Sequence, residues 1–126
     1  MEEKFNKNEK LYRMVLNKPN FWKTELGRPT SAVFKDSKGV SVDRDGGRDD
    51  ESITSSFIKR FGSEKVKAIV YVDVDFCHEI DTHLVYAPLE DNPYHAEIHD
   101  SPNKIALTSS KARKLAKHCK IVYYDE

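Results

Sequence analysis

The sequence predicts an α+β domain, built mainly from an antiparallel sheet of five or six strands with two or three helices. Short runs in which apolar and polar residues alternate recur along the chain, as expected for half-buried strands. Two other segments place apolar residues three and four positions apart, which is typical of amphipathic helices. These helical segments alternate irregularly with the extended ones, which favours an α+β fold over a doubly wound sheet.

A chain of 126 residues is the size of one domain, so we expect a single domain over residues 1–126. Residues 1–10 are mostly charged and are expected to be frayed or to form a first helical turn. The run "LYRMVL" at 11–16 fits either a first strand or the end of a helix, because it is too short for its period to decide.

The first half of the chain contains a predicted hairpin and a predicted helix. "TSAVF" at 30–34 and "GVSVD" at 39–43 flank a turn that ends at Gly39, which indicates a β-hairpin. The loop that follows leads to Asp49 or Asp50, either of which can cap the next helix. That helix, "ESITSSFIKRFG", has an apolar stripe and ends at Gly62. The stripe consists of Ile53, Phe57, Ile58 and Phe61.

The second half contains the strongest predicted strand, 66–76, in which valines alternate with polar residues. Two further strands are expected at 82–89 and 94–99. A helix over 109–119 is capped by Thr108 or Ser109, and its apolar positions are Ala112, Leu115, Ala116 and Cys119. The chain then continues with a strand at 120–124.

Composition narrows the classes of function. The 21 basic and 21 acidic side chains cancel, so the chain as a whole does not attract a polyanion such as nucleic acid. No apolar run approaches the roughly 20 residues that span a bilayer, and the first residues lack the apolar core of a signal peptide. We therefore expect a cytoplasmic protein. Cys77 and Cys119 are too few for a disulfide scaffold and are expected to be buried and reduced.

The stretch "NPYHAEIHD" places His95, Glu97 and His99 at every second position. In a strand, side chains two residues apart lie on one face, about 6.6 Å apart along the axis. Imidazole and carboxylate groups are suitable ligands for zinc, iron or manganese, so the three form a candidate metal site that would need a fourth ligand. His83, Asp75 and His78 are examples of residues that could supply that ligand. The alternative is a half-buried strand with Ala96 and Ile98 inward.

The stretch "VDVD" offers a second candidate cation site. Asp73 and Asp75 share a face if the strand continues through them, and paired carboxylates bind divalent cations in hydrolases that act on nucleic acids. A metal-dependent nuclease is therefore one alternative function. A solvated strand face, on which the like charges discourage edge pairing, is the other interpretation.

A series of motifs along the chain resembles the ADP-ribosyltransferase-like superfamily, including the small RES-type toxins that degrade NAD. "LYR", "GRPTSAVF", "GVSV", an apolar helix, a strand and "HAE" occur in that order. The resemblance implies that Arg13 binds the phosphate or nicotinamide amide of NAD, and that Ser31 orients the site. It also implies that Glu97 stabilises the ribosyl cation, as a carboxylate beside developing positive charge does. This hypothesis requires Arg13, Ser31 and Glu97 to converge in one cleft.

The stretches "RPTSAVFKDSKGVSVDR" and "NPYHAEI" are similar to small uncharacterised bacterial proteins that occur beside mobile-element and defence genes. That resemblance implies a role in a bacterial defence or toxin system and names no activity.

Our first functional hypothesis is a small binding or accessory protein that acts through a protein partner and needs no cofactor. Phe21 and Trp22, in the loop "NKPNFWKTE", are the candidate contacts, because aromatic side chains dominate the binding energy of protein interfaces. The same pair can instead anchor the loop to the core. An enzyme that uses or cleaves NAD is the first alternative, and a nuclease that uses a divalent metal is the second.

Overall fold

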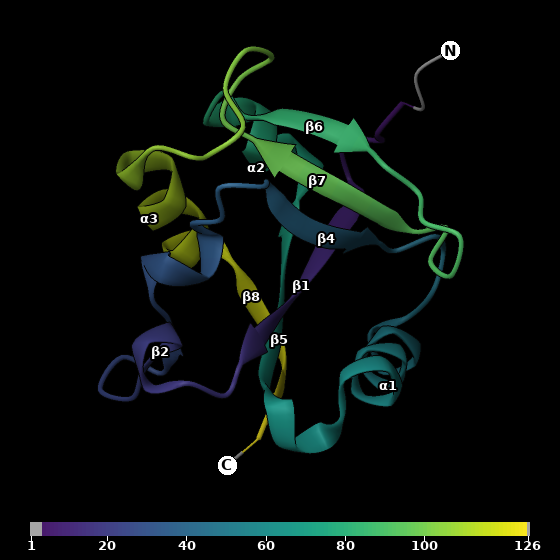
Figure 1. The fold of residues 1–126 in the computed structure, drawn as a ribbon, viewed down its shortest axis with the longest axis vertical. Helices are drawn as coiled ribbons and strands as arrows, with labels where there is room; N and C mark the ends of the chain where they lie inside the picture. The colour runs from purple at the N-terminus through teal and green to yellow at the C-terminus, as the bar shows by residue number, and fades with distance from the viewer. Residues whose placement is uncertain (1–3, 126) are drawn as a thin grey trace.

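The computed structural model describes residues 4–125 and contains a six-stranded antiparallel sheet in the order β6-β7-β4-β1-β5-β8 (Figure 1). The strands of this sheet are β1 (Lys10–Leu16), β4 (Val40–Arg44), β5 (Val66–Asp73), β6 (His83–Tyr86), β7 (His95–His99) and β8 (Lys120–Tyr124). A small second sheet pairs β2 (Trp22–Lys23) with β3 (Arg28–Pro29). The α-helices are α1 (Asp50–Phe61), α2 (Val74–Glu79) and α3 (Ser109–His118). The predicted α+β domain is therefore confirmed.

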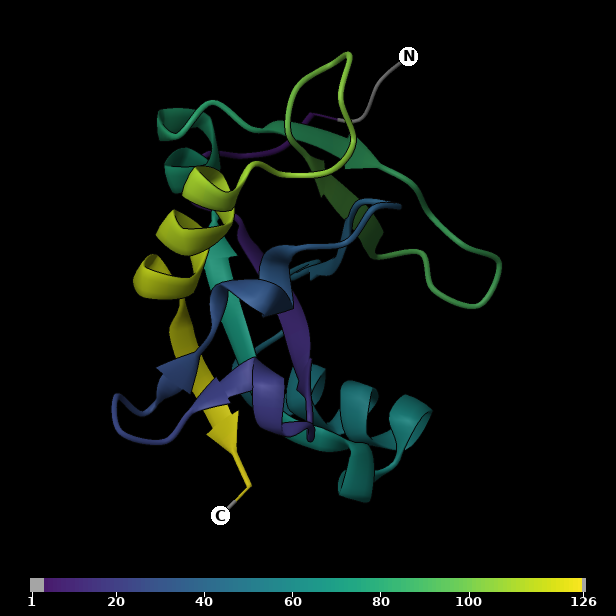
Figure 2. The same cartoon turned by 60° about the vertical axis from the view of Figure 1, so that its left-hand side comes forward.

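Helices cover the two faces of the sheet unequally. One face packs against α2, α3 and the 3-10 turn η2 (Ser31–Phe34), and its larger hydrophobic cluster includes Val42, Val70, Ile98 and Leu115. The other face packs against α1 in a smaller cluster formed by Tyr12, Ile53, Phe57, Val66 and Ile69. Figure 2 shows α3 against the first of these faces, with α1 at the other end of the molecule. Burying apolar side chains on both faces is what stabilises the sheet.

The predicted helix ends are confirmed. Asp49 caps α1 by accepting a hydrogen bond from Ser52 N at 2.8 Å, and Thr108 caps α3 by accepting one from Lys111 N at 3.2 Å. Gly62 ends α1 with φ of +90°, in the left-handed region that side chains with a Cβ rarely adopt. These local signals place α1 and α3 without reference to the rest of the fold.

Replacing Thr108 with alanine is expected to lower the free energy of unfolding by about 1 kcal/mol, because the Lys111 N–H loses its acceptor. Urea unfolding followed by circular dichroism measures the change. Thr108→Ser keeps the hydroxyl group and is the matched control, which should remain close to the wild type. Equal destabilisation by serine and alanine would show that the methyl group, and not the cap, is what Thr108 contributes.

The predicted hairpin over 30–43 is wrong in its first half. Residues 31–34 form η2 and not a strand, whereas Val40–Arg44 is a strand as expected. β4 pairs with β7 over Val40–Asp43, and its last two residues pair with β1, so no residue of 30–34 is a strand partner of β4. The consecutive residues Val33 and Phe34 are both buried, which a turn allows and a strand with one wet face does not.

The predicted strand over 66–76 is also too long. β5 ends at Asp73, and α2 begins at Val74 because the Asp73 carboxylate accepts a hydrogen bond from Phe76 N at 2.7 Å. Asp73 and Asp75 therefore do not share a strand face, which removes the arrangement on which the nuclease hypothesis relied. In the sequence, an aspartate that caps a helix cannot be distinguished from one that continues the alternation of a strand.

The start of the chain also differs from the expectation of a frayed or helical 1–10 segment, of which residues 1–3 lie outside the described residues. Lys7 O and Glu9 O accept hydrogen bonds from Asp75 N and Val74 N, and β1 begins at Lys10. The run at 11–16 is thus a strand in the middle of the sheet. Within residues 4–125, no helix has both the length and the apolar character needed to cross a bilayer.

Candidate functional site

The predicted alternation along 95–99 is confirmed. β7 is extended, Ala96 and Ile98 are buried, and the three polar residues between them are half-buried. Because residues that pair across antiparallel strands share a face, Glu97 lies beside Ser41 of β4 and Val85 of β6. His95, Glu97 and His99 therefore lie on the face of the sheet opposite the larger hydrophobic cluster.

The three polar side chains of β7 make separate contacts. His99 Nε2 lies 2.7 Å from Glu97 Oε1, and His95 Nδ1 lies 2.8 Å from the carbonyl oxygen of Ala87. His83 is close to His99, with ring centroids 6.5 Å apart. Among residues 4–125, no group of three or more His, Cys, Asp or Glu side chains is placed to hold a metal ion. The structure thus brings Glu97 and His99 together, while His95 contacts Ala87, at the start of the connection between β6 and β7.

Arg13 joins the sheet to the turn that follows it. Its Nε donates to Val33 O at 2.8 Å, and its Nη1 donates to Ser41 O at 2.7 Å. Burial lowers the pKa of the guanidinium to about 10, with Asp36 opposing that shift, so the group stays charged at neutral pH. Both of these donors are used on backbone carbonyls, which gives Arg13 a role in holding η2 against β1 and β4.

The structure does not bring Arg13, Ser31 and Glu97 into one cleft. Arg13 lies between Leu11 and Val15 on β1, on the face that carries the larger hydrophobic cluster, and Ser31 begins η2 over that face. Glu97 lies on the other face. The sheet therefore separates Glu97 from the other two residues of the predicted NAD site.

Phe21 and Trp22 are half-buried and pack against the larger hydrophobic cluster. The Trp22 ring also contacts Tyr124 of β8, with centroids 5.0 Å apart. This contact ties the β2–β3 sheet to the outer strand β8. The pair therefore anchors its segment to the core, and only part of each ring remains available to a partner.

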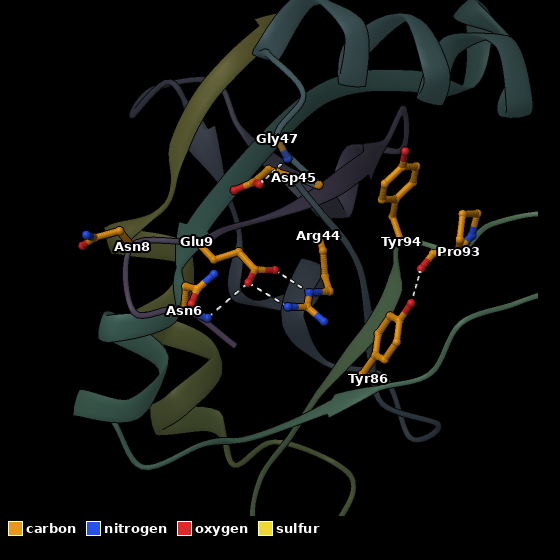
Figure 3. A pocket seen from close by; sticks show the side chains of 10 residues that line it. Asn6, Asn8, Glu9, Arg44, Asp45, Gly47, Tyr86, Pro93 and Tyr94 are labelled. Atoms are coloured by element: carbon orange, nitrogen blue, oxygen red, sulfur yellow. Dashed lines mark hydrogen bonds and ion pairs between the residues drawn. The ribbon is translucent and has the colours of Figure 1, made fainter. Parts of the chain in front are cut away.

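A hollow lies elsewhere, where the segment before β1 meets the ends of β4 and β6 (Figure 3). Its volume is about 700 Å³. Asn6, Asn8 and Glu9 line one side, Arg44 and residues 45–47 another, and Tyr86 with Pro93 and Tyr94 a third. None of these is among the candidate site residues named from the sequence. They come from separate segments that only the folded chain brings together.

A buried ion pair forms the centre of this hollow. Arg44 Nη2 donates to Glu9 Oε1 at 2.9 Å, and Nε binds the other carboxylate oxygen, so the contact is bidentate. The Arg44 guanidinium also lies over the rings of Phe5 and Tyr86, at 4.3 and 5.0 Å from their centroids. Figure 3 shows the two charged groups facing each other with Tyr86 and Tyr94 to one side. The Arg44 guanidinium is thus held in place by the Glu9 carboxylate and by two aromatic rings.

A glycine turn shapes the wall next to it. Gly46 has φ of +58°, and a Cβ at this position would lie 2.3 Å from the Tyr94 ring, so the ring packs directly on the backbone. The Arg48 guanidinium covers Tyr94 at 3.6 Å from the ring centroid. The turn at 45–47 therefore fixes the position of an aromatic side chain at the edge of the hollow.

A smaller hollow of about 390 Å³ continues on the other side of this turn. Asn8, Asp45 and Gly47 line both, so the two hollows form one groove that we call the turn groove. Its far end carries Asp49 and Asp50. The Tyr12 hydroxyl donates to Asp50, and burial followed by this hydrogen bond raises the pKa of Tyr12, which keeps it a donor.

The turn groove contains groups suited to binding and few suited to covalent catalysis. The residues that line it include no serine, threonine, cysteine or histidine. Glu9 is paired with Arg44, and Asp45 accepts hydrogen bonds from Lys10 N and Gly47 N, both at 2.9 Å. Among the described residues, no buried side-chain N or O atom lacks a hydrogen-bond partner. Nothing in the groove is thus poised as an activated nucleophile with its base.

The cysteines are equally unsuited to catalysis. Both are free thiols, and Cys77 is fully buried. Burial raises the pKa of Cys77 to about 12 and that of Cys119 to about 11, so neither forms the reactive thiolate at neutral pH.

Comparison of the chain with protein-family models, curated proteins and solved structures gives no match.

Proposed function

We propose that this chain is a protein-binding module and that its partner docks in the turn groove. The observation that carries the proposal is the combination of side chains there: the aromatic rings of Tyr86 and Tyr94 beside Arg44, around an open hollow of about 700 Å³. Tyrosine and arginine are enriched among the residues that dominate the energy of protein interfaces.

The state of the polar groups supports a protein partner over a small molecule. Small-molecule sites are concave and hold a few convergent polar groups that fix the orientation of the ligand. In the turn groove those groups are already engaged: Glu9 binds Arg44, and the Tyr86 hydroxyl donates to Pro93 O at 2.8 Å. What remains for a partner is the ring surface that the guanidinium groups leave uncovered, aliphatic surface, and the exposed residues Asn6 and Asn8. Such a surface binds best to another protein whose shape is complementary to it, because packing then excludes water from the rings.

The charge along the groove indicates how the partner lies in it. At one end of the groove the carboxylates of Asp45, Asp49 and Asp50 outnumber the cations of Lys10 and Arg48. At the other end Arg44 and Glu9 neutralise each other. A partner segment that crosses the groove therefore places a basic side chain near these carboxylates and an apolar or aromatic one between Tyr86 and Tyr94. Two free thiols suit the reducing cytoplasm, which is where we place the protein. No step of this proposal requires a cofactor.

The test is site-specific photo-crosslinking in an extract of the source cells. A photoreactive residue is placed at Asn8, inside the turn groove, and separately at Glu25, in the exposed turn that connects β2 to β3. We expect one protein to crosslink from position 8 and not from position 25. Affinity for that protein is then measured with Asn8→Trp, which fills the groove. Glu25→Trp adds the same ring to an exposed position outside the groove and is the matched control.

A loss of affinity of about tenfold or more for Asn8→Trp, with Glu25→Trp unchanged, supports the proposal. Crosslinking from position 25 alone would overturn the proposal and indicate that the partner binds near β2 and β3, where Phe21 and Trp22 lie. Equal labelling of many proteins from both positions would also overturn it. Circular dichroism of each variant confirms that the fold is intact.

A further inference from the structure

A second surface is formed by residues other than those of the turn groove and differs from it in charge. Between Ser101 and Tyr124 the chain has six Lys or Arg residues and no Asp or Glu. The remaining residues hold 15 of the 21 basic side chains and all 21 acidic ones. A protein with zero net charge therefore concentrates its positive charge in the segment that forms α3 and β8.

The fold leaves most of this charge exposed. Arg113, Lys114 and Lys117 of α3, and Lys120 at the start of β8, are exposed. Lys111 is the exception, because its Nζ donates to Asp81 O and Asp100 O at 2.8 Å. The apolar positions of α3, such as Leu115, face the core, so the helix presents its cations outward.

A hollow of about 470 Å³ lies between α2 and α3 beside these cations. Figures 1 and 2 both show the two helices next to each other. Phe76 and Ile80 of α2 line it and also pack against the larger hydrophobic cluster, so its floor is apolar and supported. Lys114 and Lys117 form the rim on the α3 side. An apolar floor beside a cationic rim matches a ligand that is apolar on one side and anionic on the other.

We infer that the hollow between α2 and α3 binds an acidic amphipathic segment of a partner protein. An apolar side chain of that segment packs on Ile80 and on the part of Phe76 that the stacked His118 ring leaves uncovered, and its carboxylates lie against Lys114 and Lys117. Recognition of an amphipathic helix by an apolar groove is a recurrent mode of peptide binding. The inference is independent of the turn groove, which differs in both residues and charge.

The surroundings of the hollow favour a peptide over nucleic acid. The His118 ring stacks on Phe76 with centroids 3.6 Å apart and planes 2° apart, so that face of Phe76 is covered and cannot stack on a base. Glu79 lines the opposite rim, and Asp73 lies 3.8 Å from His118 Nε2. A continuous phosphate backbone would meet these carboxylates, whereas a peptide can place a neutral or basic residue there.

Fluorescence anisotropy with defined probes tests the inference. The probe is a fluorescein-labelled amphipathic peptide with leucines on one face and glutamates on the other. One control peptide replaces the leucines with serine, and a second replaces the glutamates with lysine. A fluorescein-labelled single-stranded oligonucleotide of equal negative charge is the third comparison. We expect binding of the first peptide only, weakening as the salt concentration rises.

Variants then locate the contact. Lys114→Glu combined with Lys117→Glu should weaken binding of the acidic peptide about tenfold or more. Lys59→Glu reverses the charge of an exposed lysine on α1 and should leave binding unchanged, as should Asn8→Trp in the turn groove. The experiments therefore distinguish a failure of this inference from a failure of the proposal that a partner docks in the turn groove. Stronger binding of the oligonucleotide, equal binding of the serine peptide, or equal weakening by Lys59→Glu would each overturn the inference.

Discussion

Replacing Arg13 with alanine is expected to lower the free energy of unfolding by about 3 kcal/mol. The guanidinium donates to Val33 O and Ser41 O, and both carbonyls lose a charge-assisted hydrogen bond when it is removed. The loss reaches beyond one residue, because these bonds hold η2 against two strands of the sheet. Urea unfolding followed by circular dichroism and by Trp22 fluorescence measures it.

Two further substitutions separate the donors from the aliphatic part of the side chain. Arg13→Met keeps much of the buried stem and removes every donor, so we expect it to lose most of the stability that alanine loses. Arg13→Lys keeps the charge but not the planar fork that reaches two carbonyls, so it should lie between methionine and the wild type. A stable alanine variant would show that Arg13 does not hold the fold and would leave it available for a role in ligand binding.

Replacing Ile98 with alanine is expected to lower the free energy of unfolding by about 3 kcal/mol. Ile98 is fully buried, and it pairs with Val40 of β4 and Leu84 of β6, so its side chain fills space between three strands and the helices above them. Truncation removes buried apolar surface and leaves a cavity that close-packed neighbours fill only in part. Thermal and urea unfolding give the size of the change.

The neighbouring residue provides the matched control. Glu97→Gln keeps the shape of a half-buried side chain on the other face and should change the free energy of unfolding by no more than about 0.5 kcal/mol. The contrast between adjacent positions tests the alternation of β7 directly. Similar losses at 97 and 98 would mean that the two faces of β7 are not distinct in solution.

Local patterns in the sequence were sufficient for most elements. The alternation in "HAEIH" predicts β7 because a strand repeats its side-chain direction every two residues, and Ala96 and Ile98 are indeed inward. Thr108 and Gly62 mark helix ends because capping and left-handed backbone are short-range effects. Each of these features depends on a few neighbouring residues, so the sequence alone determined the fold class, α1, α3 and the direction of the β7 side chains.

Contacts between distant segments decided the rest. The turn at Val33 and Phe34 packs both side chains into the larger hydrophobic cluster and is held by a hydrogen bond from Arg13 of β1. Asp73 caps α2 although its alternation continues that of β5. The separation of Arg13 from Glu97 follows from which face each strand presents once the sheet is assembled. The turn groove joins segments more than 30 residues apart, as the bond between Glu9 and Arg44 shows. Such pairings depend on strand order and register, which the whole chain sets by burying its apolar faces together.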